Sequence, residues 1–370
     1  MNYLLGLALL AMVLPQMGNL GPLGYLPIGA VLVAVYATNR SVFRSGQLWY
    51  EVGGRLCLLG MAIGTILHGG MISYAYVFFG LLLFYFYPVF RSRGIERYVL
   101  KGVFFLLLVT IIPTAPSEYG IDHFYDNPNN YSGVVLCTLY LGCVVYHNSW
   151  WRQLLLFVFA VGCIYLGASR SVFGAVLVFG LLYFGQRYLL RTTLRATLVV
   201  GLVAMGFAYY TLIKDDRFKL MEAVQQTTVS EHKKERGLSH RDHLFFISLG
   251  IAREHPEGVG MGRSNVEIGE RYEYAYTPHN TFLKTLVEGG WLMLTGFMLL
   301  IGGFFLTSSS TLASSFLFTL CVRGLFESST PFSISLISSM WILIMFLDER
   351  SVKQLADIAI TLPRRRVPLP

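Results

Sequence analysis

Three side chains in this sequence are suited to binding an anion and moving a proton. Arg170 lies between two apolar runs, Arg241 begins an amphipathic stretch, and His279 immediately precedes another apolar run. A guanidinium stays charged and can grip a phosphate with two hydrogen bonds, while a neutral imidazole can accept a proton. Simpler roles stay open: a membrane-surface anchor, a solvated charge and a turn residue, respectively.

A glycine turn between the second and third of these residues is a further candidate. The segment Gly258-Val-Gly-Met-Gly262 lacks the strand–turn–helix context of a dinucleotide site and the lysine of a P-loop. We therefore interpret it as a flexible turn in which Gly260 lets the backbone approach a ligand. Arg263 follows directly and is predicted to bind substrate.

The apolar run that follows His279 contributes two more predicted substrate-binding residues. Asn280 stands at its start, where free helix N–H groups offer positive potential to an anion. Glu288 lies nine residues beyond His279, inside the run, where it either pairs or orients the helix. Farther along, Arg323 and Glu327 flank the end of another run and are expected to pair with each other.

The sequence predicts no metal site and no cofactor. His240 and His243 are three residues apart, but no third ligand completes a zinc set. All five cysteines lie in apolar runs without CxxC spacing, which indicates ordinary helix residues. No GxSxG elbow or Ser-His-Asp set stands out either.

The composition is that of a membrane protein. Of the 370 residues, 54% are hydrophobic and only 14% are charged, far below the roughly 25% of soluble domains. The net charge is +8, and the basic residues lie mostly in short segments between apolar runs. We therefore expect no nucleic-acid binding. No basic segment precedes the first run, which is therefore expected to be a membrane helix and not a cleaved signal peptide.

Apolar runs long enough to cross a membrane, or nearly so, recur along the chain and predict about twelve spans. We place them at 3–17, 20–37, 54–68, 71–89, 98–114, 132–147, 154–168, 171–187, 196–213, 280–306, 310–326 and 330–347. The segments after even-numbered spans are mostly basic, apart from the uncharged 308–310, whereas 115–131 is acidic. The positive-inside rule then places both termini in the cytoplasm.

This topology divides the chain into four parts. Residues 1–213 form spans one to nine, 214–279 a large outer loop, 280–347 spans ten to twelve, and 348–370 a basic cytoplasmic tail. The loop is expected to be partly helical, with amphipathic helices at 216–227 and 241–254. All the polar candidates named above then meet at the outer face of an all-α polytopic membrane protein.

Four stretches together resemble the O-antigen ligase and polymerase superfamily of bacterial envelope polysaccharide synthesis. They are Gly167-Ala-Ser-Arg-Ser171; the run from Arg241 through Glu254-His-Pro-Glu-Gly-Val-Gly-Met-Gly262; His279-Asn-Thr-Phe-Leu283 with Glu288-Gly-Gly-Trp291; and Phe124-Tyr-Asp-Asn-Pro-Asn-Asn-Tyr131. Each motif is weak alone, but their order, spacing and common side of the membrane are fairly specific. The similarity covers residues 115–300.

The resemblance implies a metal-independent, inverting glycosyltransferase of the bacterial inner membrane with its active site on the periplasmic face. The donor would be a glycan on undecaprenyl diphosphate, held by Arg170 and Arg241, and His279 would be the general base. As a ligase it would transfer the finished polysaccharide to a sugar hydroxyl of the lipid A core. As a polymerase it would add the growing chain to a lipid-linked repeat unit. The compact single loop and the His-Asn-x-x-Leu sequence favour the ligase.

A transporter of lipid or glycan is a rival of a different class. It would carry charged residues in mid-span and paired broken helices at corresponding positions of two halves. The polar residues gather at one face instead, and no internal repeat is visible. The sequence therefore favours the enzyme.

Overall fold

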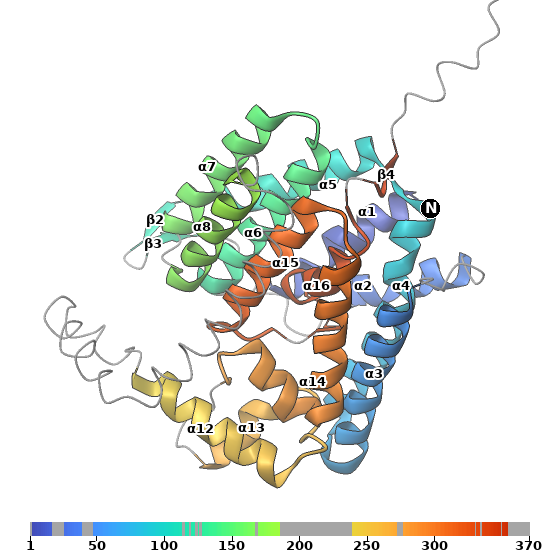
Figure 1. Cartoon of the computed structure of the whole chain (residues 1–370), viewed down its shortest axis with the longest axis vertical. Coiled ribbons are helices and arrows are strands. Elements are labelled where there is room, and N and C mark those ends of the chain that lie inside the picture. The colour runs from blue at the N-terminus through green and yellow to red at the C-terminus, as the bar shows by residue number, and fades with distance from the viewer. Residues whose placement is uncertain are drawn as a thin grey trace, which may run out of the picture.

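A computed structural model describes residues 2–16, 26–38, 47–112, 115–117, 120–122, 125, 128–166, 169–185, 239–271, 277–329, 331–333, 335–348 and 350–353. Helices account for nearly all of the regular structure in these residues (Figure 1). The helices are α1 (Asn2–Ala11), η1 (Leu14–Gln16), α2 (Leu26–Thr38), α3 (Leu48–His68), α4 (Met71–Arg93), α5 (Arg97–Thr110), α6 (Pro128–Val145), α7 (Trp150–Leu166), α8 (Arg170–Gly185), α12 (Ser239–Glu254), α13 (Ser264–Arg271), α14 (Thr281–Thr307), α15 (Thr311–Gly324) and α16 (Leu336–Leu343).

Two very short strand pairs complete the described structure. β1 (Ile95–Glu96) pairs in parallel with β4 (Val352–Lys353), and β2 (Ala115–Ser117) pairs antiparallel with β3 (Gly120–Asp122). Neither pair forms a layer of its own. The described part of the chain is therefore essentially all-α.

Length and apolarity identify membrane helices in the described chain. α3, α4 and α14 are long and apolar enough to cross a bilayer, and five further apolar helices are shorter. Large apolar side chains stay exposed on the outward sides of these helices, including Ile66, Phe78, Leu155, Leu181 and Leu306. Lipid tails stabilise such a surface whereas water does not, so the chain is an integral membrane protein.

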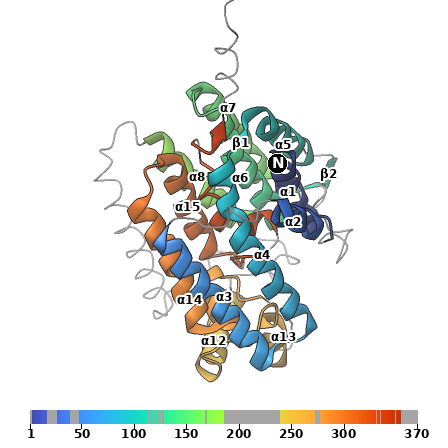
Figure 2. The same ribbon diagram turned by 90° about the vertical axis from the view of Figure 1, so that its right-hand side faces the viewer.

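α3 and α14 run antiparallel with their backbones in close contact (Figure 2). Gly53 lies against Gly296, and Gly60 lies against the Gly289 carbonyl, only 2.5 Å from where a Cβ on Gly60 would stand. Small residues allow membrane helices to approach this closely, which increases their van der Waals contact. The resulting α3–α14 pair reaches the end of the molecule where α12 and α13 lie (Figure 1).

α12 and α13 pack onto the first part of α14. Buried apolar residues of α12, α13, α14 and the turn between α12 and α13 form a separate small core, made of Leu244, Ile251, Ala252, Val259, Ile268, Leu283, Leu286 and Val287. The amphipathic pattern that predicted a helix at 241–254 thus has a physical basis, because its apolar side packs against a membrane helix.

Most predicted apolar runs correspond to helices, but some elements differ from the prediction. The span expected at 330–347 contains α16 of only eight residues, and α13 was not predicted. The span expected at 280–306 is α14, which breaks at Gly290. The predicted span 196–213 and loop helix 216–227 lie outside the described residues.

Candidate functional site

The start of α14 holds His279 in a constrained backbone conformation. His279 has φ 49°, in the left-handed region that few non-glycine residues adopt, and its side chain is half-buried. Next to it Asn280 caps the helix, since its side-chain oxygen accepts from the Leu283 N–H at 3.0 Å. The Asn280 amide donates in turn to the Leu325 carbonyl at 3.3 Å. Asn280 therefore fixes the backbone on which His279 stands.

The segment 325–329, which follows α15, forms a second wall beside this helix start. The Thr281 hydroxyl donates to the Glu327 carbonyl at 2.8 Å and accepts from the Ser329 N–H at 3.1 Å. The Thr277 and Ser328 hydroxyls lie 2.6 Å apart. We call residues 277–281 together with 325–329 the α14 entry. Side chains make most of the bonds that hold it.

The α14 entry is joined directly to the beginning of α8. Oε1 of Glu327 accepts a hydrogen bond from Ser171 at 3.0 Å, and Ser169 donates to Asn129, at the start of α6, at 2.8 Å. Arg170 stands between these two serines as the first residue of α8, and the structure describes its backbone only. The backbone of one predicted arginine thus lies next to residues that contact the His279 segment.

Arg323 adds a buried positive charge close to this junction. Its side chain is 3% exposed, at the end of α15, and neither Nε nor Nη1 has a hydrogen-bond partner among the described residues. Nη2 lies beside Gly133 of α6, and Glu327 one turn later exerts an attractive charge on the guanidinium. A guanidinium with donors to spare can bind an anion. The expectation of a simple Arg323–Glu327 pair captured only part of this arrangement.

Arg241 lies in the first turn of α12, and the structure describes its backbone only. Leu244, three residues later, is buried in the same small core as Leu283 and Leu286 of α14. The end of α12 that carries Arg241 is thereby held against the first turns of α14. The start of α8, with the backbone of Arg170, is thus linked to the α14 entry, whereas α12, with the backbone of Arg241, packs on the turns of α14 that follow the entry.

A second arrangement lies at the other end of this first part of α14, about 14 Å along the helix from its start at Thr281. At Gly290 the backbone takes φ 68° and ψ −169°, which interrupts the helix. The freed groups bond with the glycine turn: Val259 N–H donates to the Val287 carbonyl at 2.9 Å, Gly260 N–H to the Glu288 carbonyl at 3.0 Å, and Trp291 N–H to the Pro256 carbonyl at 3.1 Å. We call residues 287–291 with 256–260 the α14 break.

The remaining predicted substrate-binding residues, Gly260, Arg263 and Glu288, gather at the α14 break. Gly260, at φ 95°, lets the turn approach the backbones of α3 and α14. The sequence predicted an approach to a ligand, and that contact stays a prediction. Arg263 donates to the His68 carbonyl and pairs with Glu267 at 3.2 Å. Glu288 is 1% exposed and accepts from the Ser264 hydroxyl at 2.7 Å. Each of the three has contacts that hold the break together, and their contact with substrate stays a prediction.

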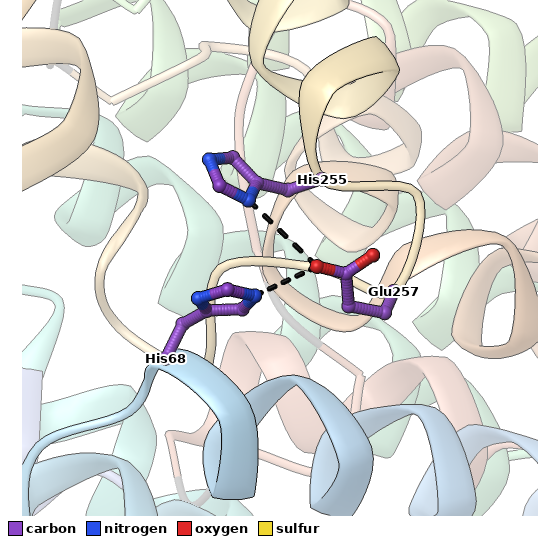
Figure 3. A group of neighbouring side chains, drawn as sticks. All are labelled: His68, His255 and Glu257. Carbon is purple, nitrogen blue, oxygen red and sulfur yellow. Dashed lines mark hydrogen bonds and ion pairs between the residues drawn. The ribbon is translucent and has the colours of Figure 1, made fainter.

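Three polar side chains meet beside the α14 break (Figure 3). Oε1 of Glu257 lies 2.7 Å from His68 Nε2 and 3.7 Å from His255 Nδ1. Hydrogen bonds from its own backbone N–H and from His68 hold the pKa of the Glu257 carboxyl below its ordinary value. Sequence reasoning missed this group because His68 and Glu257 are 189 residues apart. The side chains of His240 and His243, considered earlier for metal, lie outside the described residues.

Residues 155–298 match the O-antigen ligase family. The match spans α7, α8, α12, α13 and the first part of α14, including Arg170, Arg241 and His279. It confirms the predicted resemblance to the O-antigen ligase and polymerase superfamily. Members of this family are membrane glycosyltransferases and ligases, and the match supports an enzyme of this general kind. Among curated proteins, none matches the chain.

Proposed function

We propose that this membrane enzyme is an O-antigen ligase. It transfers a polysaccharide from undecaprenyl diphosphate to a sugar hydroxyl of the lipid A core, at the periplasmic face of the bacterial inner membrane. The observation that carries the proposal is the junction through Glu327, which bonds both Ser171 beside Arg170 and, through its carbonyl, Thr281 beside the His279 segment. This junction supports the proposal because it links the start of α8, whose first residue is Arg170, to the segment that carries His279.

The proposed reaction is a displacement at the anomeric carbon. The acceptor oxygen forms a bond to that carbon as the bond to the diphosphate oxygen breaks, which inverts the configuration. His279 takes the proton of the acceptor hydroxyl. Arg170 and Arg241 stabilise the negative charge that develops on the departing diphosphate, because fixed cations aimed at developing charge lower the barrier. Arg323 adds a third cation to this group.

The proposed topology follows from the charge pattern and supports this placement. Both termini lie in the cytoplasm, and about twelve spans leave the 214–279 loop on the periplasmic side. α12 and α13, which belong to that loop, lie together at one end of the molecule (Figure 1). Apolar surface between the membrane helices would receive the polyprenyl tail of the donor.

In vitro transfer with purified full-length protein tests the mechanism. Arg241→Ala and His279→Ala should lower the rate by about 100-fold or more while the protein still inserts and folds, as expected for loss of charge stabilisation or of a general base. Arg253→Ala, on the same helix as Arg241 but exposed, and His147→Ala, a half-buried histidine after α6, are the matched controls. Wild-type rates in both test variants would overturn the mechanism.

The polymerase is the second candidate, because the O-antigen ligase match alone does not specify the acceptor. The glycan profile of a deletion strain separates the two. Accumulated lipid-linked polymer that never reaches the lipid A core supports the ligase. Envelope lipid that carries a single repeat unit would instead support the polymerase. A flux assay with the purified protein in vesicles would detect a transporter.

A further inference from the structure

His68, His255 and Glu257 form a group of metal-ligating atoms outside the proposed catalytic junction. The two imidazole nitrogens and one carboxylate oxygen all lie within 4.8 Å of one another, and each side chain is roughly one-third exposed. Figure 3 shows both histidine rings directing a nitrogen toward the same oxygen of Glu257. The ring centroids are 4.8 Å apart, and the ring planes are inclined at 69°. Three ligand atoms therefore lie close enough together for one metal ion to contact them all.

The chemistry of this set fits zinc. Two histidine nitrogens and one carboxylate oxygen are a known ligand set for Zn²⁺, which takes water in the fourth position. With bonds of about 2.0–2.2 Å, tetrahedral ligand atoms lie about 3.4 Å apart. The two measured distances from Glu257, 2.7 and 3.7 Å, fall on either side of that value. Small side-chain rotations would reach it, and the partial exposure leaves room for a water ligand.

The backbone around the group is held in place before any ion binds. A Cβ added to Gly64 of α3 would lie 3.1 Å from the Glu257 carbonyl, so the turn rests directly on α3 one turn before His68. His255 follows α12 immediately and accepts the N–H of Gly258 on its carbonyl at 2.9 Å. The nearby cation Arg263 is paired with Glu267, which reduces its repulsion toward a bound metal ion.

We propose that His68, His255 and Glu257 bind one Zn²⁺ ion that links the end of α3 to the turn docked in the α14 break. The role is structural: the ion fixes the outer end of the α3–α14 pair, on which α12 and the first part of α14 rest. This inference does not depend on the proposed transferase activity, and a metal-free catalytic step is compatible with it.

Zinc binding by the purified full-length protein tests the proposal. The protein is treated with EDTA, freed of chelator, and titrated with Zn²⁺ alone by calorimetry, with metal content measured after desalting. We expect one zinc per chain and a rise in Tm, because an ion that binds the folded state stabilises it by mass action. Replacement with Co²⁺ should give visible absorption bands of four-coordinate intensity.

Two variants and one control decide the assignment. Glu257→Gln, which keeps the size of the side chain, and His255→Ala should each weaken zinc binding by more than about 100-fold, since even residues that only orient a zinc ligand contribute 10- to 100-fold. His147→Ala removes a half-buried histidine outside the group and should leave zinc binding intact. Absence of stoichiometric zinc in the wild-type protein would overturn the proposal. So would variants that bind zinc as tightly as wild type, or a lowered Tm in the variants with no response of the wild type to zinc.

Discussion

The α14 entry and the α14 break lie at opposite ends of one helical segment, and different parts of the chain hold them. At the entry, side chains make the bonds: Asn280 and Thr281 bind the backbone of 325–329. At the break, three backbone N–H groups bond to three backbone carbonyls, with glycines at the points of closest approach. Backbone hydrogen bonds hold the glycine turn against α14 without the help of side chains. The break therefore serves as a fixed frame, while the entry presents the groups suited to chemistry.

The predicted site residues are divided between the α14 entry and the α14 break. His279, Asn280 and the backbones of Arg170 and Arg241 belong to the entry or to segments attached to it. Gly260, Arg263 and Glu288 belong to the break. The four predictions below test this division, beginning with the largest expected effect.

Gly290→Ala should destroy the break. Its φ of 68° with ψ −169° is a conformation open essentially to glycine alone, and a Cβ would lie 2.4 Å from the Pro256 carbonyl oxygen. We expect a loss of about 3 kcal/mol or more of stability, measured as Tm and as the monodisperse fraction in detergent. Gly302→Ala, on the same helix with open space around it, is the control and should be neutral or stabilising. A normal Tm for Gly290→Ala would show that the break is not a rigid frame.

Glu288→Ala should weaken the break by a smaller amount. The Ser264 hydroxyl would lose its buried acceptor, and Lys284, 3.8 Å from Oε1, would lose its partner. An unsatisfied buried polar group costs about 1–3 kcal/mol, so thermal unfolding should move to lower temperature. Glu270→Ala, on the exposed side of α13, provides the comparison. If the variant has normal thermal stability but loses transfer activity, Glu288 instead contacts the substrate, as the sequence predicted.

Asn280→Ala should lower both stability and transfer through the entry. Loss of the helix cap costs about 1 kcal/mol, and loss of the bond to the Leu325 carbonyl frees the backbone that carries His279. Asn280→Asp keeps the capping oxygen and removes only the amide donor, so it should retain most of the stability but lose part of the transfer rate. If the two variants behave alike in thermal unfolding and in transfer, the capping oxygen and the amide donor of Asn280 do not have separate roles.

Glu254→Gln should have the smallest effect. Glu254 pairs with Arg271 at 2.6 Å, but the carboxylate is 60% exposed and bridges the ends of α12 and α13 in contact with water. Exposed ion pairs contribute little to stability. Neither Tm nor transfer should change measurably. A clear loss of either would extend the frame from the α14 break to the outer surface of α12 and α13.

Much of the helical structure was predictable because its signals are local. The helix expected at 241–254 is found at Ser239–Glu254, and the run expected at 71–89 is found at Met71–Arg93. Pro256 and the alternating glycines correctly marked the end of α12. The Gly289-Gly290 pair, however, lies inside an apolar run, and hydropathy alone predicts a continuous helix there. The break exists because the glycine turn supplies partners for the backbone groups that Gly290 frees.

Sequence alone was enough to indicate a helical membrane protein that resembles the O-antigen ligase and polymerase superfamily, and to single out His279, Arg241 and Arg170 as the residues to test. Apolar length and short motifs are local properties, so they can be recognised without coordinates. Only the tertiary structure separated the entry from the break, buried Arg323 near Gly133 of α6, and brought His68 to Glu257. Those contacts join segments far apart in the chain, and their geometry depends on how closely glycines let α3, α14 and the loop turn approach.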